Sequence, residues 1–264
     1  MKTILSTVLF AGMLFAVPSI GHAQDWRATV PYNCGFDDPV ENGAWILLNG
    51  DSTVANKWYI DTAVACCGGG DATSCGKSLY ISDMEGITYN FAGGTPAYHY
   101  DNSIASRVIA YRDFAFAQGT YVVSFDWNGV GEPNCDMLIA ALVPSSDTTL
   151  LIGSTELPRG VSAWSLPEGW ISLKGNGNGT GLYNAPGWQR NEKVVEIGAS
   201  GNPSPGVSYY KLVFIWSNDY ADGSNPPAAV DNIDIRQVTC MPPMALAATQ
   251  DVHSITLNWQ AAGN

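Results

Sequence analysis

Basic residues and histidine are scarce in this chain. It has 12 lysines and arginines against 24 aspartates and glutamates, a formal net charge of −12, and 3 histidines. Nucleic acids and anionic membrane surfaces attract basic proteins, so the acidic balance argues against both as partners. It suits a soluble extracellular protein that binds cations.

Motifs of several enzyme classes are missing as well. The chain has no Gly-x-Ser-x-Gly elbow and no His-Glu-x-x-His, so the sequence indicates neither serine-hydrolase nor zinc-protease chemistry. Gly76-Lys77-Ser78 resembles part of a phosphate-binding loop, but Asp71 stands where that loop requires a glycine. A glycoside hydrolase needs only two carboxylates, and that class stays open because no specific pair is indicated. We therefore expect no catalytic residues and no enzyme activity.

Long apolar runs are confined to the amino terminus. Lys2 precedes an apolar run over residues 4–20, and the small residues Gly21 and Ala23 lie before Gln24. This pattern predicts a secretory signal peptide over residues 1–23. The run is short for a membrane span of about 20 residues, and no other stretch is long enough to cross a bilayer. We expect a secreted or cell-surface protein without membrane insertion.

The chain has an even number of cysteines. The six are Cys34, Cys66, Cys67, Cys75, Cys135 and Cys240. In an exported protein an even count favours disulfides, although fifteen pairings are possible. A metal knuckle built from the cysteines of residues 66–75 is the alternative, but vicinal cysteines lack the spacing of a zinc site. If the first and last strands are neighbours, Cys34 could bridge Cys240, which leaves Cys75 to pair with Cys66 or Cys67, and Cys135 with the other.

Period-two alternation dominates the middle of the chain. Residues 121–127 place four large apolar side chains on one face, and residues 210–217 are apolar on both faces, as in a central strand. Further strand candidates are residues 57–60, 78–82, 108–116, 137–143, 189–197 and 230–238. No run has helical spacing. The pattern predicts an all-β fold, a β-sandwich or jelly roll.

The tail forms a separate segment. Two prolines follow Cys240, and they mark a boundary because proline stops strand pairing. Residues 244–248 and 254–259 then read as two strands that resemble the start of a fibronectin type III domain. Such a domain needs about 100 residues. We therefore expect a jelly-roll domain over residues 24–240 and a truncated fibronectin type III fragment over residues 241–264.

Several segments occur in an order that suggests a family. They are Phe36-Asp37-Asp38, Gly43-Ala44-Trp45, and residues 56–60, 78–82, 110–113, 124–127, 212–216 and 229–233. Together they resemble the MAM-like jelly-roll domains of secreted bacterial surface proteins, which include the cleaved-adhesin modules. The resemblance implies a non-catalytic module that binds an extracellular glycan, or a host or matrix protein. The alternative is an accessory binding domain of a secreted peptidase or glycoside hydrolase whose catalytic module lies outside this chain.

The same resemblance implies a structural calcium ion. It maps ligands onto Asp37 and Asp231, and Asn49 and Asp51 are plausible further ligands because calcium takes six to eight oxygens. Asp231 lies two residues before Ile233 in the same predicted strand, so we expect both side chains to point inward. A bound cation would offset the cost of burying the carboxylate. The alternative is that Asp37 and Asp231 cap turns or accept backbone hydrogen bonds.

Aromatic residues around a Gly/Asn-rich stretch are candidates for sugar stacking. Residues 175–181 form this loop, and Trp164, Trp170 and Tyr183 flank it. Clustered exposed aromatic side chains often mark a binding surface. The other tryptophans of the predicted strands, Trp45, Trp58, Trp127 and Trp216, are expected in the core, as is Trp188.

Overall fold

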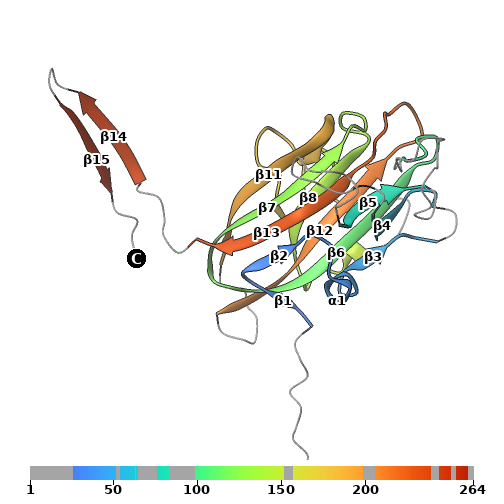
Figure 1. Ribbon diagram of the computed structural model, residues 1–264, viewed down its shortest axis with the longest axis horizontal. Coiled ribbons are helices and arrows are strands. Elements are labelled where there is room, and N and C mark those ends of the chain that lie inside the picture. The colour runs from blue at the N-terminus through green and yellow to red at the C-terminus, as the bar shows by residue number, and fades with distance from the viewer. Residues whose placement is uncertain are drawn as a thin grey trace, which may run out of the picture.

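The protein is described by a computed structural model. It covers residues 26–51, 54–62, 64, 76–83, 99–151, 157–198, 206–238, 244–250 and 254–260. This part of the chain is nearly all β-strand (Figure 1). Its elements are β1 (Ala28–Thr29), β2 (Tyr32–Cys34), α1 (Pro39–Asn42), β3 (Ile46–Leu48), β4 (Lys57–Asp61), β5 (Ser78–Ser82), β6 (Ser106–Ala117), β7 (Gly119–Gly129), β8 (Met137–Pro144), the 3₁₀ turn η2 (Thr149–Leu151), β9 (Ile171–Ser172), β10 (Gly181–Leu182), β11 (Ala185–Ile197), β12 (Val207–Asn218), β13 (Ala229–Gln237), β14 (Met244–Gln250) and β15 (Ile255–Gln260).

Strands β1 to β13 form a jelly-roll sandwich of two sheets. The first, sheet A, has the order β1-β6-β12-β8-β10, with β3 paired to β6 and β9 paired to β8. The second, sheet B, has the order β11-β7-β13-β5-β4, with β2 paired to β13. Every strand predicted from period-two alternation is present, with ends shifted by a few residues. The all-β prediction is confirmed.

The two end strands of the domain are neighbours, as expected. In Figure 1 the blue strand β2 lies beside the orange-red strand β13, and Cys34 is opposite Ile233. Beyond β13 the backbone amide of Val238 still donates to Thr120 O of β7, at 2.8 Å. Val238 is five residues past the partner of Cys34, or about 16 Å along a strand.

The structure does not contain the disulfides predicted for Cys34 and Cys135. Cys34 is a free, buried thiol, and Cys135 is also free. The expectation that these two cysteines are bridged is corrected. Cys66, Cys67, Cys75 and Cys240 lie outside the described residues.

The core lies between the inward faces of the two sheets. Trp45, Trp58, Trp127 and Trp216 are at most 5% exposed, so their predicted core positions are confirmed. Phe125 of sheet B meets Phe214 of sheet A edge-on, with ring centroids 5.1 Å apart. These aromatic side chains join the two sheets across the core.

A second apolar cluster covers the outer face of sheet A. Residues 145–151 and 157–170, after β8, bring Leu150, Val161 and Trp170 against Ile139 and Ile215. Trp170 is 7% exposed, and its indole nitrogen donates to Asp147 Oδ2 at 2.6 Å. The expectation that Trp170 is an exposed binding residue is wrong, because its ring closes this second core.

The tail forms a two-stranded antiparallel sheet of β14 and β15, which confirms its two predicted strands. Its membership of a fibronectin type III domain stays a prediction. Within the described residues no helix is long and apolar enough to cross a membrane. The predicted signal peptide lies outside the described residues.

Candidate functional site

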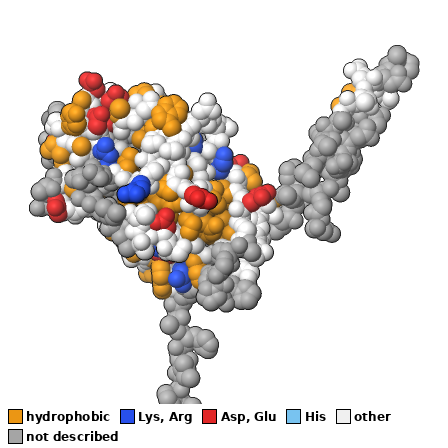
Figure 2. Space-filling view, turned by 180° about the vertical axis from the view of Figure 1, so that it is seen from behind, with side chains coloured by type: hydrophobic (Ala, Val, Ile, Leu, Met, Phe, Trp, Pro, Cys, Tyr) orange, Lys and Arg blue, Asp and Glu red, His pale blue; other side chains and the backbone are white. Residues whose placement is uncertain are grey.

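A groove of about 530 Å³ runs along strand β11, which is an edge of sheet B. We call it the β11 groove. On the face of the molecule in Figure 2, acidic and basic side chains are interspersed, so neither kind dominates that face. The β11 groove is lined by Trp127, Lys174, Gly175, Asn176, Gly181, Leu182, Tyr183, Gln189, Arg190, Asn191 and Glu192.

The loop that forms one wall of the groove is held by Asn191. This buried amide donates to Leu173 O at 2.7 Å, and its oxygen accepts from Gly175 N at 2.9 Å. A side chain at position 175 would collide with the carbonyl oxygen of Glu192 on β11, so glycine permits this close approach. The loop is therefore fixed against β11 where it enters the groove.

Lys174 lies between the two backbone groups that Asn191 binds. Its ammonium donates to Asn178 O at 2.8 Å and lies 5.7 Å from the centre of the Tyr183 ring. Partial burial lowers the pKa of Lys174, because removing an ammonium group from water disfavours its charged form. The groove thus combines an aromatic ring with a partly desolvated cation.

Arg190 joins the groove to the outer face of sheet B. Its guanidinium lies 3.2 Å from Asp126 Oδ1 and donates to Ser124 Oγ and Asn232 O, each at 2.8 Å. Three partners on two neighbouring strands fix this side chain. This polar part of the groove lining is therefore ordered.

Trp164 lies on the other side of the same loop. Its ring is 63% exposed, and a side chain at Gly179 would come 3.1 Å from it. Thr180 N donates to Ala163 O at 2.7 Å, which ties the loop to the segment that carries Trp164. The structure therefore brings two of the three predicted aromatics, Trp164 and Tyr183, to one loop. Trp188 is partly buried, at the register shift between Ala185 and Gln189.

A second group of residues converges around Gly35, after strand β2. A side chain at position 35 would place its Cβ 3.7 Å from Asp37 Oδ2, 3.7 Å from Asn232 Oδ1 and 3.8 Å from Asp231 Oδ1. The absence of a side chain at Gly35 thus leaves a space that three oxygen atoms surround. The predicted pair, Asp37 and Asp231, is brought together, and Asn232 joins it.

The backbone also contributes to this cluster, as the alternative predicted. Asp37 Oδ1 accepts from Lys77 N at 2.9 Å, and Asp231 Oδ1 accepts from Asn232 N at 2.7 Å. A side chain at Gly76 would collide with the Asp37 carboxylate. Both acids are therefore held in place by neighbouring backbone.

The direction expected for Asp231 is wrong. A β-bulge between Asp231 and Asp234 breaks the alternation, and Asn232 has a left-handed φ of 48°. Asp231 is directly opposite Asp126 on β7, so both lie on the outer face of sheet B. Asp231 is nevertheless only 4% exposed.

The two further predicted ligands, Asn49 and Asp51, make hydrogen bonds elsewhere in the structure. Asn49 donates to Trp58 O at 2.9 Å and accepts from Trp58 N at 2.7 Å, so its amide binds the backbone of strand β4. Its role as a calcium ligand stays a prediction. Asp51 is an exposed residue whose carbonyl accepts from Val54 N.

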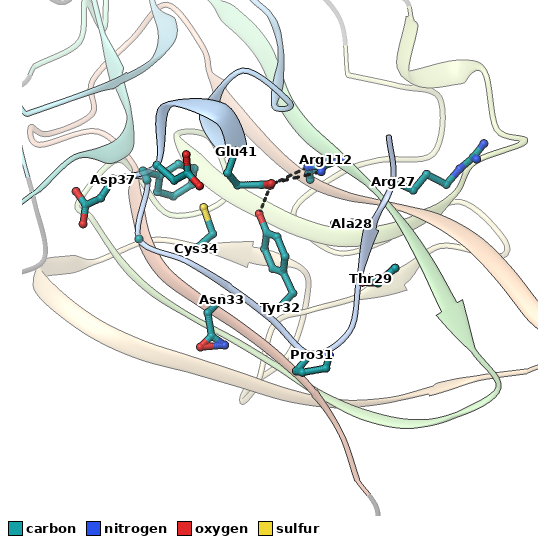
Figure 3. Close-up of a pocket in the computed structure, with 13 residues that line it drawn as sticks. Arg27, Ala28, Thr29, Pro31, Tyr32, Asn33, Cys34, Asp37, Glu41 and Arg112 are labelled. Carbon is teal, nitrogen blue, oxygen red and sulfur yellow. Dashed lines mark hydrogen bonds and ion pairs between the residues drawn. The ribbon is translucent and has the colours of Figure 1, made fainter. Parts of the chain in front are cut away.

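A second cavity, of about 540 Å³, lies beside β2 and α1 (Figure 3). Figure 3 shows Asp37 and Cys34 at one end and Arg27 at the other. In its middle, Arg112 Nε lies 2.8 Å from Glu41 Oε1, which also accepts from the Tyr32 hydroxyl at 2.7 Å. Burial and the neighbouring Cys34 raise the pKa of Tyr32 far above its usual range, so its hydroxyl stays protonated. These polar groups satisfy one another and hold α1 to the sandwich.

An acidic cluster lies at one end of the sandwich. Asp136 is fully buried; it accepts from the Tyr100 hydroxyl at 2.5 Å and from Asp219 N at 3.0 Å. Burial raises its pKa to about 6, and Asp219 and Glu132 add to the effect. Ligand atoms of Glu132, Cys135 and Asp219 also lie within 4.8 Å of one another. No sequence motif predicts this cluster, because its residues come from segments that are distant in the chain.

His99 is the histidine within the described part of the chain. Its Nδ1 lies 3.0 Å from Asp83 Oδ1. Such a pair orients an imidazole, but hydrolysis by this route also requires a nucleophile held by the other ring nitrogen. The pair alone therefore does not indicate an enzyme.

Comparison with known proteins gives similarity at the level of the fold. No family model and no curated protein matches the sequence. Among solved structures, the CBM22-1 xylan-binding domain of Paenibacillus barcinonensis Xyn10C is 10% identical, with a TM-score of 0.40, over 80% of this chain and 95% of that one. The K1 cleaved adhesin domain of Lys-gingipain from Porphyromonas gingivalis W83 is 9% identical, with a TM-score of 0.37, over 78% and 98%. At these scores the similarity identifies neither a ligand nor a site residue in this chain.

Proposed function

We propose that this protein is a non-catalytic, extracellular glycan-binding module. The observation that carries the proposal is the β11 groove, where Tyr183 stands beside exposed hydrogen-bonding side chains of β11. Sugars present apolar C–H faces and hydroxyl edges. An aromatic wall with fixed polar groups nearby matches both, and such pockets orient ligands through a few polar contacts.

Trp164 extends this surface on the far side of the loop. Its exposed ring offers a second stacking face, so a chain of several sugars could contact Tyr183 in the groove and Trp164 outside it. Trp170 has no part in this proposal, because its ring is buried in the second core.

A structural calcium ion belongs to the proposal. The three oxygens around Gly35 suit calcium, which prefers carboxylate and amide ligands. Asp126 and Asp231 stand directly opposite each other, and like charges so placed are destabilising. Arg190 lies beside Asp126, and a cation bound by Asp37, Asp231 and Asn232 would further reduce the repulsion between the two opposite carboxylates.

Screening of the purified protein on a glycan array tests the proposal. We expect binding to at least one polysaccharide, and loss of at least about tenfold in affinity in Tyr183→Ala or Trp164→Ala, because stacked aromatics are frequent binding hot spots. Trp26→Ala is the matched control. Trp26 is 57% exposed, and its backbone carbonyl accepts from Arg112 of β6, which belongs to sheet A and not to the sheet that carries the groove. Equal binding by all three variants would refute the assignment of the site, and binding to matrix proteins alone would refute the glycan as ligand.

A further inference from the structure

The β11 groove has an excess of positive charge in an acidic protein. Its charged lining residues are Lys174, Arg190 and Glu192, whereas the whole chain carries twice as many acidic as basic residues. Cations gathered in a groove raise the local concentration of anionic ligands. The lining of this groove therefore carries a net positive charge, whereas the chain as a whole is acidic.

Two of these three charges have opposite charges beside them. Arg190 lies 3.2 Å from Asp126, and Glu192 lies 3.7 Å from Arg236. Lys174 differs, because its ammonium contacts a backbone carbonyl and the face of Tyr183. Among the described residues no carboxylate lies at ion-pair distance from Lys174.

The position of Lys174 is fixed in advance of binding. Asn191 binds the backbone on both sides of it, and Asn178 O accepts one of its three protons. An ammonium group has three donors, so two remain for a ligand. Preorganised groups of this kind bind with a smaller loss of entropy.

We propose that the β11 groove recognises acidic glycans, with Lys174 bound to the anionic group of a sugar residue that packs against Tyr183. This inference rests on the glycan-binding function proposed above and names its ligand class. The anionic group is a carboxylate of a uronic acid or a sulfate ester; both offer the oxygen acceptors that form charge-assisted hydrogen bonds with lysine.

Binding of a polyuronate oligomer, measured by calorimetry against the same oligomer after reduction of its carboxylates, tests the inference. We expect the polyuronate to bind more tightly, and Lys174→Gln to weaken that binding by about tenfold, as for a charge-assisted contact. Binding of the reduced oligomer should be the same in both proteins. A sulfated glycan that binds more tightly than the polyuronate, with the same dependence on Lys174, would support the proposal with sulfate as the group.

Lys57→Gln is the matched control, because Lys57 is on β4 at the opposite edge of sheet B. It removes the same charge and should change binding by less than about twofold. Tighter binding of the reduced oligomer, or no effect of Lys174→Gln, would overturn the inference. If neutral glycans still bind through Tyr183, that result leaves the proposed glycan-binding function standing. If no glycan binds, both the proposed function and the inference of acidic glycans are refuted.

Discussion

Asn191 holds the backbone on both sides of Lys174. Its side-chain amide binds Leu173 O at 2.7 Å and Gly175 N at 2.9 Å, and Lys174 is the residue between them. Asn191 is 6% exposed, so these two hydrogen bonds are shielded from water. The amide thereby links a strand of sheet B to the loop that carries the only lysine of the groove lining.

Replacing Asn191 should affect both stability and binding. In Asn191→Ala the Leu173 carbonyl and the Gly175 amide lose their partner, and we expect the free energy of unfolding to fall by about 1–3 kcal/mol. Urea unfolding measures this. Asn33→Ala is the control, since the exposed Asn33 amide binds Asp234 at the surface and should cost less than about 0.5 kcal/mol.

A double-mutant cycle separates positioning from general destabilisation. If Asn191 acts on the ligand through Lys174, then Asn191→Ala should weaken glycan binding in the native background and have little further effect in Lys174→Gln. Additive effects on binding would show that the two residues act independently.

The sandwich could be predicted from the sequence, whereas the groove could not. The alternation of side chains in residues 121–127 can be read in the sequence itself, so the strands and the core tryptophans could be predicted from it. The contact of Asn191 with Leu173 and Gly175 depends on how a loop folds back over an edge strand. No local pattern encodes that path. Asp231 shows the same limit, since one bulge moved its carboxylate to the other face.

Calcium should stabilise the protein. If the ion is held by Asp37, Asp231 and Asn232, chelation should lower the melting temperature, because a ligand that binds the folded state stabilises it by about 2.7 kcal/mol at a hundredfold excess over its Kd. Asp231→Ala should remove most of this dependence. Glu196→Gln, an exposed acid on β11, should retain it. Differential scanning calorimetry with and without chelator measures both, and an unchanged melting curve in metal-loaded protein would contradict the site.

Asp136 should make stability depend on pH. Burial raises its pKa to about 6, whereas an unfolded aspartate titrates near 4. Between these values the folded state binds the extra proton, so this contribution is complete below pH of about 4 and is lost as the pH rises through about 6. Urea unfolding across this range should show wild type losing up to about 3 kcal/mol relative to Asp136→Asn. Parallel stability curves for the two proteins would show that folding does not raise the pKa of Asp136.

Glu41 should stabilise the protein by neutralising Arg112. The arginine side chain is 6% exposed, and Glu41 is its carboxylate partner at 2.8 Å. Glu41→Ala would leave a buried charge without compensation, which costs about 3–5 kcal/mol. Adding Arg112→Met should recover part of that loss in urea unfolding. Arg236→Met, at a surface pair with 58% exposure of the arginine, should cost less than about 1 kcal/mol.

The two described thiols should differ in reactivity. Cys34 is 6% exposed and Cys135 is partly exposed, and burial raises the pKa of both. Because the thiolate is the reactive form, Cys135 should alkylate slowly at neutral pH, and Cys34 should react only once the protein unfolds. Peptide mass spectrometry after a pulse of iodoacetamide, with and without urea, measures the order. Detection of Cys34 in a disulfide-linked peptide from native protein would contradict the free thiol.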